Sequence, residues 1–110
     1  PRHLSRANTS ILAAVESVYW CMVDAAQAVL MNVEELAPSP EEIPKLLIQI
    51  YVDTGKLSMK YVEWFNEMYA VVHHISHGQI TEVSGKEIHM YKERADEFLG
   101  KMAELVKQSS

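Results

Sequence analysis

Most of this 110-residue chain carries apolar residues at the spacing of an α-helix, and short segments rich in proline or glycine interrupt that pattern. The pattern predicts four helices, over about residues 10–31, 40–52, 57–78 and 86–107. No segment shows the alternation of a half-buried strand over a useful length. Because the connections are short or moderate, we expect an all-α fold in which the four helices form an antiparallel bundle.

The ends of these helices are predicted from residues with strong positional preferences. One of the polar residues at 8–10 can cap the first helix, so residues 1–8 are expected to be a flexible or truncated N-terminus. Gly55 and Gly78 can adopt the left-handed conformation that ends a helix, and each stands at the end of a predicted helix or shortly after it. The later helices are expected to begin after small residues, namely Ser39, Ser58 and Ser84 or Gly85.

The composition is that of a single globular domain, expected to cover residues 1–110. Apolar residues make up 48% of the chain and charged residues 23%, far from the low-hydrophobicity, high-charge composition of disordered chains. The formal net charge of −5 argues against a broad basic face for nucleic acid, although it is compatible with a local site.

Several features bear on the cellular compartment. No apolar run approaches the roughly 20 residues that span a bilayer, and no signal-peptide core follows the first residues. The single cysteine, Cys21, lies in an apolar helical run, so an internal disulfide is excluded and a buried thiol is expected. These features predict a protein of the reducing cytoplasm that makes no membrane contact.

The third predicted helix has two distinct faces. At about 100° per residue, one stripe is apolar and is expected to face the core; it comprises Tyr61, Phe65, Met68, Val72 and Ile75. On the opposite side, Asn66, His73 and His77 fall together, with Tyr69 at their edge. Three of the five histidines of the chain lie at the end of this helix, so we seek the chemistry of the protein there.

His73 and His77 are spaced by one helical turn, which can bring two imidazoles to one metal ion. The further ligands of a helical-bundle metal centre are not apparent, because no glutamate has a histidine three residues after it. We therefore predict no metal and no cofactor.

Without a metal, the histidines can exchange protons near neutral pH, as the attack of a 2′-hydroxyl on an RNA phosphodiester requires. A cation is also needed to hold the phosphate, and arginine is the usual choice. Two other interpretations stay open. In the first, His73 and His74 are only exposed while His77 interacts with the helix end. In the second, the face with Asn66, Tyr69, His73 and His77 is a subunit interface.

The segment Ile75-Ser76-His77-Gly78, at the end of a third helix and before a long fourth helix, resembles the HEPN (higher eukaryotes and prokaryotes nucleotide-binding) domain family. The alanine-rich run Asp24-Ala25-Ala26-Gln27-Ala28 is similar to part of that family's early helix. The run from Leu46 to Leu57 is similar to its second helix and turn. The resemblance covers about residues 10–107 and implies an all-α bundle that pairs as a homodimer.

The resemblance also implies roles for particular residues. His77 matches the motif histidine and Gly78 the glycine that often follows it, while His73 takes a polar position that is commonly asparagine. Active relatives use an arginine upstream of the histidine to cut RNA without metal, but the arginine position here is Val72.

Two candidate cations are Lys60, upstream on the same helix, and Arg94 on the fourth helix, which could serve only if folding brings it near. The binding residues expected from these considerations are His73, His74, His77, Asn66, Tyr69 and Arg94.

The sequence therefore favours a HEPN-like module that binds a nucleotide or RNA, or regulates a minimal nucleotidyltransferase partner, without catalysis. The first alternative is a metal-independent endoribonuclease of a toxin–antitoxin type system, with His77 and His73 as catalytic residues. The second alternative is a purely structural or interaction bundle.

Overall fold

The computed structural model describes residues 2–80 and 82–109, with side chains described for 10–80 and 82–108, and this part of the chain contains helices but no strand. The elements in chain order are α1 (Arg2–Met31), the 3₁₀-helix η1 (Pro40–Glu42), α2 (Ile43–Leu47), the π-helix η2 (Ile48–Val52), α3 (Met59–Ser76) and α4 (Gly85–Ser109). The all-α prediction is confirmed. Residues 40–52 form one continuous helical segment, as predicted, but three kinds of helix follow one another within it. None of the helices in the described residues is long and apolar enough to cross a membrane.

Helix α1 begins at Arg2, so the cap predicted at residues 8–10 is wrong. Polar residues such as Asn8 and Ser10 lower helix propensity only modestly, and the 2–31 segment contains neither proline nor glycine to stop the helix.

Three helical segments end in the same way, with one residue in the left-handed region. Gly55 (φ 78°) and Gly78 (φ 72°) do so as predicted, and Glu34 (φ 60°) does so unexpectedly after α1. After α3, for example, the Gln79 N–H donates to the His74 carbonyl (2.8 Å) and the Gly78 N–H to the Ile75 carbonyl (3.0 Å). This is the pair of bonds of a Schellman motif, which satisfies carbonyls that the helix itself leaves free.

Serine side chains cap the starts of α3 and α4, also as predicted. The Ser58 hydroxyl accepts a hydrogen bond from the Lys60 N–H (3.3 Å). At α4 the Glu87 N–H donates to the Ser84 hydroxyl (3.0 Å) while the Ser84 N–H donates to the Glu87 carboxylate (3.1 Å). This reciprocal arrangement is a capping box, and it follows from the Ser-x-x-Glu spacing.

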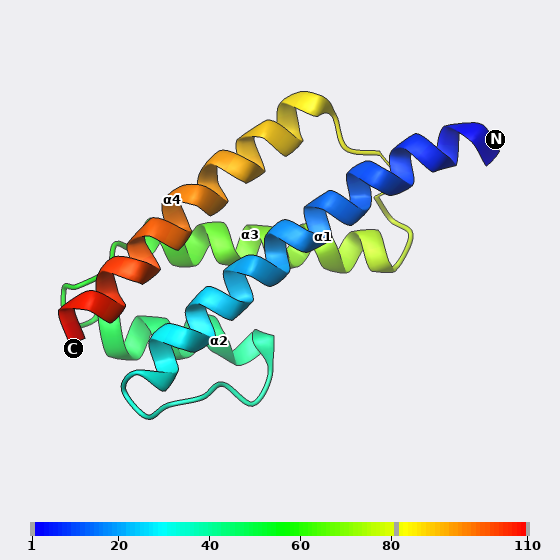
Figure 1. Cartoon of the computed structure of the whole chain (residues 1–110). Helices are drawn as coiled ribbons and strands as arrows, with labels where there is room; N and C mark the ends of the chain where they lie inside the picture. Colours follow the sequence, from blue (N-terminus) through cyan, green and yellow to red (C-terminus); the bar gives the residue numbers. More distant parts are fainter. Residues whose placement is uncertain (1, 81, 110) are drawn as a thin grey trace.

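The long helices do not all pack antiparallel (Figure 1). Helices α1 and α4 lie side by side and run in the same direction, and the Asn32 side chain after α1 reaches the Val106 carbonyl near the end of α4 (3.4 Å). Helix α3 runs antiparallel to α4, as expected, since Lys60 pairs with Glu97 and Glu67 with Arg94. Helix α1 contacts α2, α3 and α4, so it is the central element of the fold.

The core forms where α1, α3 and α4 face one another. The stripe predicted on α3 is confirmed at Tyr61, Phe65 and Met68, which are buried, whereas Val72 and Ile75 are partly buried against the core. The Phe65 ring lies between those of Tyr19 and Phe98, with centroids 5.8 Å and 6.0 Å away. Side chains from three helices therefore meet at one aromatic centre.

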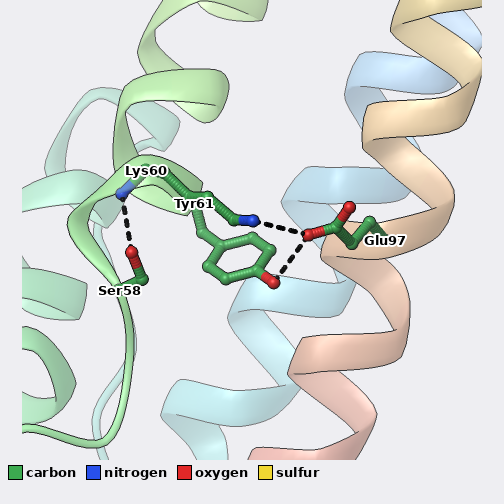
Figure 2. A network of polar contacts seen from close by, with 4 residues as sticks. All are labelled: Ser58, Lys60, Tyr61 and Glu97. Atoms are coloured by element: carbon green, nitrogen blue, oxygen red, sulfur yellow. Dashed lines mark hydrogen bonds and ion pairs between the residues drawn. The ribbon is translucent and has the colours of Figure 1, made fainter.

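A polar contact joins α3 to α4 at the edge of this core (Figure 2). One carboxylate oxygen of Glu97 accepts a hydrogen bond from the Tyr61 hydroxyl (2.8 Å) and lies 3.0 Å from the Lys60 ammonium nitrogen. These contacts raise the pKa of Lys60 and lower the pKa of Glu97. Lys60 is thus occupied by an acidic partner.

Cys21 is exposed, so the prediction of a buried thiol is wrong. The buried residues of this part of α1 are Tyr19, Met22, Val23 and Ala26. Cys21 lies two residues from Tyr19, which is about 200° around a helix, and therefore points away from the core.

Candidate functional site

Three histidines lie at the end of α3, and the rings of two of them, His73 and His77, are close together but inclined by 46°. The ring centroids of His73 and His77 are 4.4 Å apart, and those of Tyr69 and His73 are 5.7 Å apart with only 24° between the ring planes. We call Tyr69, His73 and His77 the ring column. His73 and His77 are exposed and Tyr69 is half-buried, so the column leads from the core to solvent.

His74 lies beside this column rather than in it. It is exposed, and its ring centroid is 6.3 Å from that of His73. Its backbone carbonyl accepts hydrogen bonds from the N–H groups of both Gln79 (2.8 Å) and Ile80 (3.2 Å). The end of α3 is therefore completed by backbone groups, and the His77 imidazole is not required for capping.

A hollow of about 260 Å³ lies next to the ring column, between α1, η1 and α3. The residues that line it are Tyr19, Trp20, Pro40, Glu41, Tyr69, Val72, His73 and Ser76. Two members of the expected site, Tyr69 and His73, thus belong both to the ring column and to the wall of this hollow.

The position of Glu41 depends on a contact made before η1. The Gln27 side chain of α1 makes two hydrogen bonds to the backbone of Ala37, accepting from its N–H (3.2 Å) and donating to its carbonyl (3.1 Å). This contact holds the 32–39 loop against α1. Pro40 and Glu41 follow directly, and the Tyr69 hydroxyl donates to the Glu41 carboxylate (3.3 Å).

Burial and hydrogen bonding adjust the pKa values around the hollow. The Ser39 hydroxyl first, and Tyr69 and His73 to a smaller extent, hold the pKa of Glu41 below its ordinary value. Burial raises the pKa of Tyr19 to about 12, and burial and the nearby Glu41 also raise the pKa of Tyr69. At neutral pH, Glu41 is therefore ionised while both tyrosines are neutral.

Three aromatic side chains around the hollow are inclined to one another. The Tyr19 and Trp20 rings make an angle of 69° with centroids 5.2 Å apart, and the Tyr19 and Tyr69 rings make an angle of 52° with centroids 6.2 Å apart. Trp20 is 49% exposed although it is a large aromatic residue. The hollow is therefore open to solvent along Trp20.

The structure does not bring Arg94 to the histidines. Its guanidinium forms an ion pair with Glu67 and lies over the Trp64 ring, 5.4 Å from the centroid. Glu67 precedes His77 by ten positions on α3, a separation of roughly 15 Å along the helix axis. Asn66, also expected in the site, is exposed one turn before Tyr69.

Val72, which the resemblance to HEPN domains would place at the motif arginine, is partly buried and packs against the core. It also forms part of the wall of the hollow. Lys60 is paired with Glu97 and Arg94 with Glu67, so both candidate cations are held by acidic partners and not by the ring column. The side chains that the structure describes include no group of three or more His, Cys, Asp or Glu that could hold a metal ion.

Sequence reasoning did not identify Tyr19, Trp20 or Glu41 as site residues. Tyr19 and Trp20 stand in an apolar run of a helix, and Glu41 has the ordinary position of an acid in the first turn of a helix, so neither feature indicates a site. Their common location depends on contacts such as that of Glu41 with Tyr69, which lie 28 positions apart in the chain.

Comparison of the chain with protein-family models, with curated proteins and with solved structures finds no match.

Proposed function

We propose that this chain is a nucleotide- or RNA-binding module, similar to HEPN domains, whose binding surface is the end of α3 with His73, His74 and His77. The observation that carries the proposal is the ring column, in which the exposed His73 imidazole stacks on Tyr69 and the exposed His77 imidazole lies beside that of His73, with centroids 4.4 Å apart. Single-stranded nucleic acids bind to such surfaces by stacking their bases on aromatic and histidine rings.

The charge of the imidazoles supplies the second part of the proposal. A neutral imidazole offers one N–H donor, whereas a protonated imidazole offers two and carries a positive charge. Both candidate cations, Lys60 and Arg94, are paired with glutamates, so we assign the attraction of phosphate to these histidines. Binding of RNA should therefore strengthen as the pH falls toward 6 and weaken with added salt.

Binding without cleavage is supported by the partners of the two candidate cations. Cleavage of a phosphodiester needs a group that steadies charge on the phosphate as the transition state forms. Val72 stands where active relatives have arginine, and Arg94 is held by Glu67. The alternative function, a metal-independent endoribonuclease of a toxin–antitoxin type system with His77 and His73 as acid and base, would need that cation from a second subunit.

The proposal also includes a homodimer and a partner protein. A HEPN-like homodimer would place two ends of α3 in one cleft, and a minimal nucleotidyltransferase is the partner that the resemblance suggests. It also includes a HEPN-like relationship of the helical fold and a cytoplasmic location. A helical bundle with a purely structural role is the second alternative.

Anisotropy of a labelled short single-stranded RNA tests the proposal. At about pH 6, His77→Ala should weaken binding several-fold, whereas His89→Ala should leave it nearly unchanged. His89 is a suitable control because it is an exposed histidine on α4 whose imidazole is paired with Glu93 (3.2 Å). Equal affinities of wild-type protein and both variants would reject the α3 end as the binding surface. Cleavage of the RNA in EDTA that is lost in His77→Ala would establish the endoribonuclease alternative.

A further inference from the structure

The hollow between α1, η1 and α3 differs in chemistry from the histidine surface beside it. It combines three aromatic side chains, Tyr19, Trp20 and Tyr69, with the carboxylate of Glu41. We infer that this hollow is a binding site for an alkylated ammonium group, such as the quaternary ammonium of a small amine or of a methylated side chain. The inference concerns a second site and does not depend on the proposed binding of RNA.

The orientation of the rings is the first argument. A planar base is best held between two parallel rings, but the rings around this hollow are inclined by 69° for Tyr19 and Trp20 and by 52° for Tyr19 and Tyr69. Rings inclined to one another can surround a compact, roughly spherical group from several sides. The faces of aromatic rings carry negative electrostatic potential and attract organic cations, which bind in such aromatic cages.

The charge of the lining is the second argument. Glu41 is ionised at neutral pH, and none of the described residues that line the hollow is lysine or arginine. Ser76 and His73 lie in the last turn of α3, where the carbonyl end of the helix adds negative potential. These features favour a cation and disfavour a phosphate or carboxylate group.

Size and access are the third argument. The volume of about 260 Å³ lies just below the range of roughly 300–1,000 Å³ that is usual for sites of drug-sized ligands. It therefore suits a small head group rather than a whole nucleotide. The 49% exposure of Trp20 leaves one side open, so a chain attached to the head group can extend into solvent.

Titration of the protein with choline, followed by the proton signal of its N-methyl groups, tests the inference. Methyl groups over aromatic faces should shift upfield as the complex forms. The neutral isostere 3,3-dimethylbutan-1-ol has the same shape without the charge, and it should bind at least about fivefold more weakly. Absence of an upfield shift, or equal affinity for choline and the isostere, would overturn the inference.

Two variants locate the site. Glu41→Gln keeps the shape and an oxygen acceptor for Tyr69 but removes the charge, so it should weaken choline binding several-fold. Glu42→Gln is the matched control, because Glu42 is the next exposed acid of η1 and is not among the lining residues. Choline binding that is equally affected, or unaffected, by both substitutions would contradict the assignment of the site.

The source of the ammonium group is resolved by competition. A peptide that carries one trimethyllysine should displace choline from the wild-type protein. Tighter binding of the peptide than of choline assigns the head group to a partner protein, and equal binding assigns it to a free amine. A peptide that binds without displacing choline would contradict a common site. Because RNA is absent from all of these measurements, their failure leaves the proposed RNA surface untouched, and the reverse also holds.

Discussion

The Tyr69 hydroxyl of α3 donates a hydrogen bond to the Glu41 carboxylate of η1 at 3.3 Å, which joins the helix of the histidines to the start of the 40–52 segment. The same tyrosine stacks on His73, with ring centroids 5.7 Å apart. Tyr69 therefore links the exposed histidines to the acidic hollow. A substitution at Glu41 should thus affect the surroundings of His73, and a substitution at His73 should affect those of Glu41.

The ionised form of Glu41 should stabilise the fold at neutral pH. Its pKa is lower in the folded protein than in the unfolded chain, chiefly because of the Ser39 hydroxyl, with a smaller contribution from Tyr69. The unfolded chain consequently binds more protons in this range, so stability rises with pH and is lost as the pH falls below the ordinary glutamate value of 4.5. Urea unfolding between about pH 7 and about pH 3 should show a shallower loss of stability for Glu41→Gln than for wild type. Identical pH profiles would show that Glu41 has no such role, and Glu42→Gln serves as the control.

Glu97 should contribute stability that is sensitive to salt. Its carboxylate bonds to the Tyr61 hydroxyl and pairs with Lys60, whose side chain is 49% exposed. Glu97→Gln should lower the melting temperature slightly at low ionic strength, and the difference from wild type should shrink in about 1 M salt. Asp96→Asn, at the neighbouring exposed position on α4, is the matched control and should change the melting temperature less. A difference that does not depend on salt would assign the effect to packing instead of charge.

Glycine at position 34 should stabilise the protein. Glu34 has φ 60°, a conformation that costs a residue with a side chain about 1–2 kcal/mol, although glycine loses more backbone entropy on folding. The two effects together predict that Glu34→Gly raises the free energy of unfolding by about 0.5–1 kcal/mol. Glu35→Gly, one residue later and without a positive φ, should lower it. Chemical denaturation measures both, and destabilisation by Glu34→Gly would contradict the left-handed assignment.

The helix boundaries were predictable wherever local chemistry determines them. Gly55, Gly78, Ser58 and Ser84 act within one turn of the chain, so their positions in the sequence identified the ends of helices. The end of α1 at Met31 was predicted correctly. The left-handed residue that completes this end, Glu34, was not predicted, since glutamate has no preference for the left-handed region.

The candidate site was only partly predictable because it depends on contacts between distant residues. Helical spacing brought Tyr69, His73 and His77 together correctly, since all three lie on one helix. Whether Arg94 would reach them depended on how α3 and α4 align, and the pairing with Glu67 places it elsewhere. The place of Glu41 beside Tyr69 could not be predicted for the same reason, since the two residues are 28 positions apart in the chain.

Cys21 should react readily in the folded protein. Its side chain is exposed on α1 beside Trp20, contrary to the apolar context of the sequence. A disulfide reagent such as Ellman's reagent should therefore modify the single thiol of each chain without denaturant, at a rate close to that measured in urea. A thiol that reacts only after unfolding would restore the buried position that the sequence suggested.

The dependence of RNA binding on His77 is the most direct test of the proposed function. Affinity for a short single-stranded RNA is measured by anisotropy at about pH 6 and about pH 8 for wild type, His77→Ala and His89→Ala. We expect tighter binding at the lower pH for wild type and His89→Ala, and weaker binding at both pH values for His77→Ala, which keeps only His73 and His74 of the proposed surface. Affinity that is the same at both pH values and in all three proteins would contradict an RNA-binding surface at the end of α3.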